Sequence, residues 1–281
     1  MSKVAVVGAG TMGNGIAHVF AQHGWETVLI DVAEDAVKRG LSAIEKNTEK
    51  QASKGVITAS ARRDLLARLK TAISLDAARD AEIVVEAATE NPKIKFEIFT
   101  ALDRLLPPKT ILASNTSSIS ITEIARHTKR PGMIVGMHFM NPVPLMPLVE
   151  VVKGHETSPG TTARVVELSK QLCKTPVEVN DAPGFVSNRV LMPMINEAIL
   201  CVQEGTATAE AVDQVMTLGM KHPLGPLALA DLIGLDVCLA IMDVLQAGLG
   251  KKYEPARLLK EMVASGRVGR KSGAGFYVYR D

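Results

Sequence analysis

A glycine-rich hexamer near the N-terminus has residue types and spacing that suggest chemistry directly. Residues 8–13 read Gly-Ala-Gly-Thr-Met-Gly; they follow the apolar run 3–7 and precede a helical pattern that extends to Gln22. In such a strand–loop–helix unit, the first glycine permits a tight turn, the second lets a pyrophosphate approach the backbone, and the third allows close helix–strand packing. The free N–H groups at the helix start then face the phosphates. The predicted dinucleotide-binding residues are Gly8, Gly10, Thr11, Met12 and Gly13.

An acidic residue ends the next strand-like segment. Asp31 closes residues 26–31, near the offset of about 20 residues at which a dinucleotide fold places its ribose-binding acid. Its carboxylate can accept hydrogen bonds from both ribose hydroxyls and would repel a 2′-phosphate. No arginine follows directly, because Val32 and Ala33 come next. NAD is therefore the predicted cofactor and NADP is disfavoured; a glycine turn that only packs is the alternative.

One histidine lies where a doubly wound sheet places its ligands. His138 falls at the end of the apolar run 133–139, whereas the other histidines lie in helices or turns, where structural roles are commoner. Glu150 interrupts a second apolar run, 148–152, and a buried carboxylate needs a partner. The turn at 141–144 would return this run beside the first, so Glu150 is predicted to orient His138 as a general acid–base. Spacing alone leaves separate structural roles for both residues equally open.

Strand-like and helical segments alternate through the first part of the chain. Short strands alternating with helix-length segments predict an α/β fold, a doubly wound Rossmann-type parallel sheet with right-handed crossovers. Two longer helices are expected at 33–51 and 60–70, joined by a turn at Gly55. The strand-like segments are residues 3–10, 26–31, 81–88, 110–115, 133–139 and 148–152.

The pattern changes near Pro183, after which apolar residues recur mostly at helical spacing. We therefore expect a dinucleotide-binding domain at 1–183 and a smaller all-α domain at 184–281. The many Leu, Ile and Met residues of the second domain favour a homodimer in which this domain packs against a second copy; packing only on the first domain is the alternative. The downstream helical stretches are about 208–220, 226–247 and 255–265, and a strand-like run, 275–279, comes last.

Composition excludes several classes of protein. The 281 residues are 47% hydrophobic and 22% charged, as in an ordinary folded protein, and Lys plus Arg (32) nearly balance Asp plus Glu (30), which gives no reason to expect a nucleic-acid partner. Three separated cysteines without a Cys-x-x-Cys pair disfavour a metal site or a disulfide framework. Apolar stretches are interrupted before the ~18 residues of a membrane span. A strand-like start leaves no room for a signal peptide, so a cytoplasmic protein without membrane association is expected.

Seven short segments occur in order along the chain: VGAGTMGNGIA (7–17), SNTSS (114–118), GMHFMNPVP (136–144), LVEVV (148–152), APGFVSNR (182–189), HPLGPL (222–227) and GRKSGAGFY (269–277). Together they resemble the 3-hydroxyacyl-CoA dehydrogenase family. The resemblance covers essentially the whole chain and is particularly close to the short, single-function bacterial members that act on 3-hydroxybutyryl-CoA. Seven segments in the right order are far more specific than the glycine loop alone.

The resemblance implies an NAD-linked interconversion of acetoacetyl-CoA and (S)-3-hydroxybutyryl-CoA. It makes His138 the general acid–base and Glu150 its orienting partner, and it assigns Ser117 and Asn188 to the thioester-linked substrate around its reacting carbonyl. A hydroxyl can donate to the 3-oxygen, where charge develops, and an amide offers both a donor and an acceptor. Without the resemblance, Ser117 reads as a turn residue and Asn188 as an exposed position on a first helical turn.

The resemblance also implies contacts to the two phosphate-bearing ligands. Lysines 46, 50 and 54 lie four residues apart, so they share one face of the first long helix. Read without the resemblance, they form a solvated stripe, and Glu90 and Lys95 are charges at a solvated helix start. The implied additional cofactor contacts are Glu90, Lys95, Asn115, Asn141 and Lys271. The implied coenzyme A contacts are Lys54 and, more weakly, Lys50 and Asn47.

One residue departs from the family pattern, and two other functions are compatible with the sequence. Met140 stands where the family commonly has phenylalanine, which concerns the shape of the pocket more than the chemistry. A β-hydroxyacid dehydrogenase acting on free acids would share the cofactor site and would not need coenzyme A. A non-catalytic NAD-binding protein would need none of the four residues Ser117, His138, Glu150 and Asn188.

Overall fold

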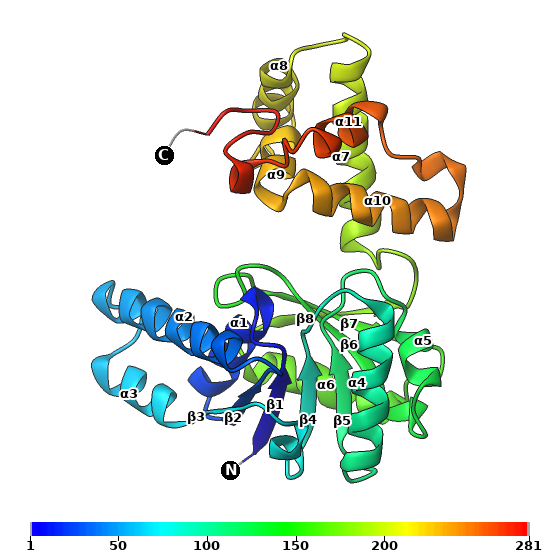
Figure 1. The fold of residues 1–281 in the computed structure, drawn as a ribbon. Helices are drawn as coiled ribbons and strands as arrows, with labels where there is room; N and C mark the ends of the chain where they lie inside the picture. Colours follow the sequence, from blue (N-terminus) through cyan, green and yellow to red (C-terminus); the bar gives the residue numbers. More distant parts are fainter. Residues whose placement is uncertain (1, 280–281) are drawn as a thin grey trace. The chain divides into compact units, whose positions relative to one another are not determined.

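The computed structural model describes residues 2–279, which divide into two compact units, one up to Asp181 and one from Ala182. The first unit is an eight-stranded sheet in the order β3-β2-β1-β4-β5-β6-β7-β8 (Figure 1). The chain therefore starts in the middle of the sheet and winds outward in both directions, which confirms the predicted doubly wound fold. The strands are β1 (Lys3–Val7), β2 (Glu26–Ile30), β3 (Leu69–Ala72), β4 (Ile83–Glu86), β5 (Ile111–Ser114), β6 (Ile134–Phe139), β7 (Leu148–Lys153) and β8 (Thr175–Asn180).

Helices cover both faces of this sheet. One apolar core joins the sheet to α1 and α6, for example through Phe20 and Leu168, and α4 lies on the opposite side of the sheet from α6 (Figure 1). The helix α4 is held by an Asn91 side-chain cap on the N–H of Ile94 and by a proline in its first turn. The helices are α1 (Thr11–Gln22), α2 (Glu34–Ser53), α3 (Ala59–Ala67), α4 (Pro92–Leu105), α5 (Ile121–Arg126) and α6 (Pro159–Gln171).

Strand alternation sorts the side chains of the central strands by chemistry. The residues that enter the α1/α6 core are apolar at every second position, such as Val85 in β4 and Met137 in β6. Successive side chains of a strand point to opposite faces, so the intervening positions face the other side of the sheet. These intervening positions include four buried polar residues near the carboxyl edge of the parallel strands: Glu86, Ser114, His138 and Glu150.

Two edge strands were not predicted, and the last two strands, β7 and β8, run opposite to the other six. The helix expected at 60–70 ends at Ala67, and Leu69–Ala72 form β3, because these residues pair in parallel with the exposed edge of β2. At the other edge, β8 pairs in parallel with β7. The turn at 141–144 returns the chain beside β6, as predicted, and β7 therefore pairs with β6 in the antiparallel direction, so the sheet is mostly parallel with one antiparallel pair.

The second unit is helical, as predicted, but its helices differ from the expected ones at two places. Gly234, at φ +105°, divides the expected helix 226–247 into α9 and α10, because this backbone conformation interrupts the helical path. Residues 215–219 form a π-helical turn after α8. Within residues 2–279, no helix combines the length and apolar character needed to cross a membrane. The helices are α7 (Ser187–Gln203), α8 (Ala209–Gln214), α9 (Pro226–Ile233), α10 (Leu235–Leu249) and α11 (Arg257–Ala264).

The strand expected at 275–279 is absent, because a buried carboxylate organises this segment as a loop. Asp231, 1% exposed, accepts hydrogen bonds from the backbone N–H groups of Phe276 and Tyr277 and from the hydroxyl of Tyr279, all at 3.0 Å. A Cβ on Gly275 would lie 1.9 Å from Oδ1 of Asp231. Gly275 of the GRKSGAGFY segment is therefore required for close packing against the Asp231 carboxylate.

Candidate active site

His138 and Glu150 are opposite each other in the antiparallel register of β6 and β7. Directly paired residues place their side chains on one face of the sheet, and Nδ1 of His138 lies 2.7 Å from Oε2 of Glu150. Both side chains are nearly buried, 5% and 2% exposed. An ionised carboxylate only accepts hydrogen bonds, so Nδ1 carries a proton and Nε2 of the neutral imidazole keeps its lone pair. The pair is thus arranged to accept a proton at Nε2 or, once protonated, to donate one there.

The hydroxyl of Ser117 lies at the other ring nitrogen. Ser117 Oγ is 3.1 Å from His138 Nε2, on the turn that follows β5. Glu90 fixes this turn, because its Oε1 accepts the backbone N–H of Ser117 at 3.0 Å and its Oε2 accepts the hydroxyl of Thr116 at 2.7 Å. Four of the sequence-predicted residues therefore meet at one point: Ser117, His138, Glu150 and Glu90.

A buried ion pair lies behind this turn. Lys95 is 1% exposed, and its Nζ donates to Oε1 of Glu86 at 2.7 Å, while Oε2 of Glu90 is 4.0 Å away. The interpretation of Lys95 as a charge on a solvated helix start is wrong, because α4 directs this side chain inward. Glu86 was not predicted from the sequence. The signal was available, because Glu86 interrupts an apolar strand as Glu150 does.

The glycine loop has the geometry of a dinucleotide site. Gly8 has φ +103° and donates its N–H to Ile30 O at 2.7 Å, and a Cβ on Gly13 would lie 1.7 Å from Gly8 O. Both glycines are thus required by the fold itself. Gly10 differs, because a Cβ there would meet no atom within 4 Å. The open space in front of Gly10, at the N-terminus of α1, leaves room for a pyrophosphate. Thr11 and Met12 form the first turn of that helix.

Asp31 lies beside this loop at the end of β2. Its Oδ2 accepts the N–H of Ala9 at 2.8 Å and its Oδ1 accepts the N–H of Ala33 at 3.2 Å, so the carboxylate also braces the glycine loop. A cavity of about 510 Å³ extends from Asp31 and Gly10 between mainly apolar side chains. Apolar walls with one acid at the rim suit a purine and its ribose. The apolar side chains that line the cavity include Ile73, Leu75, Ile94 and Ile98.

The loop between β6 and β7 is held by a lysine in the turn just before β8. Lys174, 8% exposed, donates from Nζ to Val143 O at 2.6 Å and to Met146 O at 2.8 Å, and burial lowers the pKa of its ammonium group. This loop carries Asn141, whose side chain is exposed. Asn115 is buried, and its Oδ1 accepts the N–H of Phe139 at 2.9 Å, which ties β5 to the end of β6 beside His138. Nothing in the sequence pattern identified Lys174.

The remaining predicted residues lie apart from this cluster or in the second unit. Asn47 and Lys50 are exposed on α2, and Lys54 caps its C-terminal end. In the second unit, Asn188 is the second residue of α7 and is half-buried. Lys271 forms an ion pair with Asp236 at 2.6 Å.

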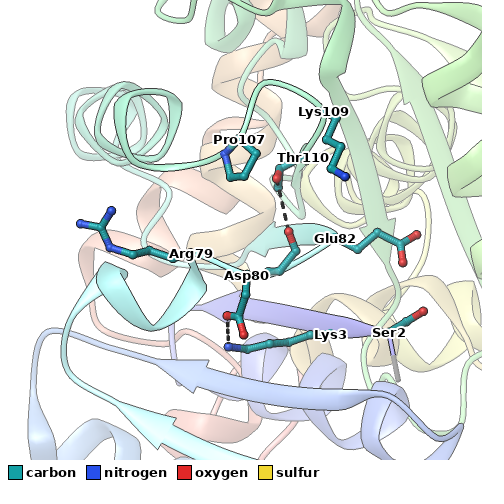
Figure 2. A pocket seen from close by; sticks show the side chains of 9 residues that line it. Ser2, Lys3, Arg79, Asp80, Glu82, Pro107, Lys109 and Thr110 are labelled. Carbon is teal, nitrogen blue, oxygen red and sulfur yellow. Dashed lines mark hydrogen bonds and ion pairs between the residues drawn. The ribbon is translucent and has the colours of Figure 1, made fainter.

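A cavity of about 800 Å³ lies at the opposite edge of the sheet, where β1 and β4 begin (Figure 2). Charged side chains of both signs line it, and Lys3 and Asp80 are paired with each other. Glu82 on its rim pairs with Arg164. Doubly wound sheets bind their ligands at the carboxyl ends of the strands, so this amino-end cavity is not the cofactor site.

Comparisons with known proteins agree along the whole chain. Residues 3–182 match the NAD-binding domain of 3-hydroxyacyl-CoA dehydrogenases and residues 184–279 match their C-terminal domain. A probable 3-hydroxybutyryl-CoA dehydrogenase of Bacillus subtilis is 53% identical, over 100% of this chain and 98% of that protein. A 3-hydroxybutyryl-CoA dehydrogenase of Bradyrhizobium diazoefficiens is 48% identical over 100% and 96%. The crystal structure of (S)-3-hydroxybutyryl-CoA dehydrogenase from Ralstonia eutropha superposes with a TM-score of 0.97 at 48% identity, with both chains fully covered.

Proposed function

Because the chain belongs to the 3-hydroxyacyl-CoA dehydrogenase family, we propose that it interconverts acetoacetyl-CoA and (S)-3-hydroxybutyryl-CoA, and that His138 and Glu150 move the proton. The observation that carries this proposal is the continuous contact from Glu150 through the His138 imidazole to the Ser117 hydroxyl. This contact provides an acid–base group, the His138 imidazole, whose Nε2 lies beside the Ser117 hydroxyl. Both groups lie at the carboxyl edge of the sheet, where a dinucleotide fold binds its ligands.

In the reductive direction, protonated His138 donates from Nε2 to the 3-oxygen of the substrate. Glu150 accepts Nδ1–H throughout, so it holds the ring orientation and stabilises the imidazolium form. Ser117 and Asn188 are proposed to hydrogen-bond the substrate around the same carbonyl, where negative charge develops. In the oxidative direction, the neutral imidazole takes the hydroxyl proton at Nε2, and the same contacts serve in reverse.

The dinucleotide is proposed to lie along the glycine loop, with Asp31 on the adenine ribose and with Glu90, Lys95, Asn115 and Asn141 toward the nicotinamide; Lys271 is proposed as a further contact. When bound, NAD(H) supplies or accepts the hydride at the substrate C3. The space at Gly10, the apolar cavity and the acid at its rim support this placement. Burial of Lys95 beside Glu86 would keep an ammonium charge in a fixed position in the site.

An absorbance assay with paired substrates and cofactors tests the proposed reaction. We expect oxidation of NADH with acetoacetyl-CoA, formation of the (S)-alcohol by chiral analysis, and far lower kcat/KM with free acetoacetate or with NADPH. Equal kcat/KM for free acetoacetate would favour a free-acid dehydrogenase. Binding of NADH without turnover of either compound would indicate a non-catalytic protein.

Asp31 is expected to control the choice between NAD and NADP. Asp31→Ser removes the charge that would repel a 2′-phosphate, so the NAD affinity should fall and the NAD/NADP ratio of kcat/KM should narrow by about tenfold, roughly the value of one charge-assisted hydrogen bond. Because Asp31 also accepts the N–H groups of Ala9 and Ala33, Asp31→Asn is the matched variant: its amide oxygen can still accept the N–H of Ala9, while the negative charge is removed. Steady-state kinetics with both cofactors measure the effect, and an unchanged ratio in both variants would remove Asp31 from the ribose site.

Lys54 is proposed, with Lys50 and Asn47 as weaker contributors, to bind the phosphates or adenosine of coenzyme A. Lys54→Ala should raise KM for acetoacetyl-CoA by about three- to tenfold with little change in kcat, because a contact made equally in ground and transition states affects only binding. Lys38→Ala is the control, since Lys38 is an exposed lysine of the same helix that pairs with Glu34. A KM that matches the control variant would exclude Lys54 from the substrate site.

We also propose that the chain forms a homodimer through the helical unit. An apolar groove of about 500 Å³ runs between α7 and α8 in this unit, and large apolar side chains beside it are exposed, among them Val215 (62%), Leu218 (80%) and Met220 (62%). Exposed apolar surface of this extent is typical of a subunit interface. Sedimentation equilibrium should give twice the chain mass, and Leu218→Glu should shift it toward one chain mass. A monomeric wild-type protein at micromolar concentration would contradict the proposal.

A further inference from the structure

Glu86 is a fully buried acid at the centre of the carboxyl edge, outside the set of residues that the proposed reaction uses. In the parallel register it lies between Val7 of β1 and Ser114 of β5, with 0% exposure. Burial of a carboxylate is costly unless it is paired and hydrogen-bonded. Both of its oxygens are engaged by named donors, so its charge is compensated within the protein.

The Oε1 atom of Glu86 holds the side on which the cofactor is proposed to bind. It accepts Nζ of Lys95 at 2.7 Å and the backbone N–H of Ala88 at 2.7 Å. Ala88 lines the same cavity as Asp31 and Gly10. The ammonium group of Lys95 is therefore held in place by a charge-assisted hydrogen bond from inside the sheet.

The Oε2 atom of Glu86 holds the side on which the substrate is proposed to bind. It accepts the hydroxyl of Ser114 at 2.7 Å, and Ser114 Oγ in turn accepts the N–H of Thr116 at 3.2 Å. Thr116 donates its own hydroxyl to Glu90, which also accepts the N–H of Ser117. The chain of contacts thus runs from Glu86 to the residue that meets His138.

We propose that Glu86 is a positioning residue that holds Lys95 on the cofactor side and the 114–117 turn on the substrate side at once. This inference rests on the proposed function, which assigns those two sides. Loss of the Glu86 carboxylate should therefore affect both NADH binding and the proton-transfer geometry. Loss of the Ser114 hydroxyl should affect only the proton-transfer geometry. A residue that merely stabilised the fold would lower the melting temperature without separating these two effects.

Three variants, each with one polar group changed, test the proposal. Glu86→Gln keeps the shape and removes the charge; we expect NADH Kd to rise and kcat with acetoacetyl-CoA to fall, each by about tenfold or more, because small misplacements of binding and reacting groups have effects of this size. Ser114→Ala should lower kcat by a similar factor and leave NADH Kd unchanged. Glu82→Gln is the matched control at the residue just before the same strand, on the rim of the cavity in Figure 2, and it should match the wild type in both NADH Kd and kcat.

The outcomes separate the alternatives. Wild-type NADH Kd and kcat in folded Glu86→Gln would overturn the proposal, and so would a lower melting temperature with unchanged Kd and kcat per folded molecule. If Glu86→Gln does not fold, Ser114→Ala decides: unchanged kcat overturns the link to the turn, and a selective fall in kcat supports it. Fluorescence titration with NADH needs no acyl-CoA, so a wild type inactive on acetoacetyl-CoA contradicts the proposed function while the binding measurement still tests Glu86.

Discussion

Replacement of His138 by alanine is expected to lower kcat for acetoacetyl-CoA reduction by about 10²-fold or more, the usual contribution of a positioned general acid–base. The variant loses the nitrogen that meets Ser117 Oγ at 3.1 Å. NADH Kd should stay near the wild-type value, because the imidazole is not proposed to hold the cofactor. Steady-state absorbance kinetics and NADH fluorescence titration measure the two quantities.

Two further variants make this result specific. His155→Ala, at an exposed position in the loop after β7, should retain wild-type kinetics and controls for the loss of any imidazole. Glu150→Gln should lower kcat by less than His138→Ala, since the ring remains and only its charged partner is lost. The double variant should be no worse than His138→Ala, because both residues act on one step. Near-normal turnover in His138→Ala, or additive losses in the double variant, would refute the shared role.

The glycine loop provides the second large effect, with opposite consequences at two positions. Gly13→Ala would place a methyl group 1.7 Å from a backbone carbonyl oxygen, so we expect the free energy of unfolding to fall by about 3 kcal/mol or the protein not to fold. Gly10→Ala meets no atom within 4 Å and has an ordinary φ of −66°. Its stability should change by less than about 0.5 kcal/mol, while NADH Kd should rise by about tenfold or more, because the methyl group occupies the approach of the pyrophosphate.

Urea unfolding and NADH titration of the two alanine variants separate the roles. Gly24→Ala is unsuitable as a control because Gly24 has φ +91°, whereas Gly160→Ala, at the start of α6 with its nearest neighbour at 4.0 Å, should match the wild type in both measurements. An unchanged NADH Kd in Gly10→Ala would mean that the dinucleotide does not lie across this loop.

The central part of the fold was predictable because local patterns and tertiary structure agree there. The strands β1, β4, β5 and β6 are short apolar runs flanked by helical segments, and the structure places them side by side. The edge strands β3 and β8 are weak in the sequence. Their pairing with the neighbouring strand stabilises them, and local propensity does not register that contribution.

The same distinction separates the site residues that sequence reasoning found from those that it missed. His138 and Glu150 could be paired from the sequence because a single short turn joins their strands. The pairing register of β6 and β7 then places the two residues opposite each other. Glu86 and Lys95 are nine positions apart, but their contact depends on how α4 crosses back over β4, which no periodicity encodes. Lys174 reaches its carbonyl partners from the turn between α6 and the unpredicted strand β8. Its role depends on tertiary packing alone.

A crystal structure of the ternary complex with NAD and acetoacetyl-CoA tests the central claim most directly. We predict that Nε2 of His138 lies about 3 Å from the oxygen on C3, with Nδ1 still on Glu150 and the Ser117 hydroxyl at the same oxygen. An imidazole beyond hydrogen-bonding reach of that oxygen, or a Glu150 carboxylate turned to another partner, would contradict proton transfer by this pair.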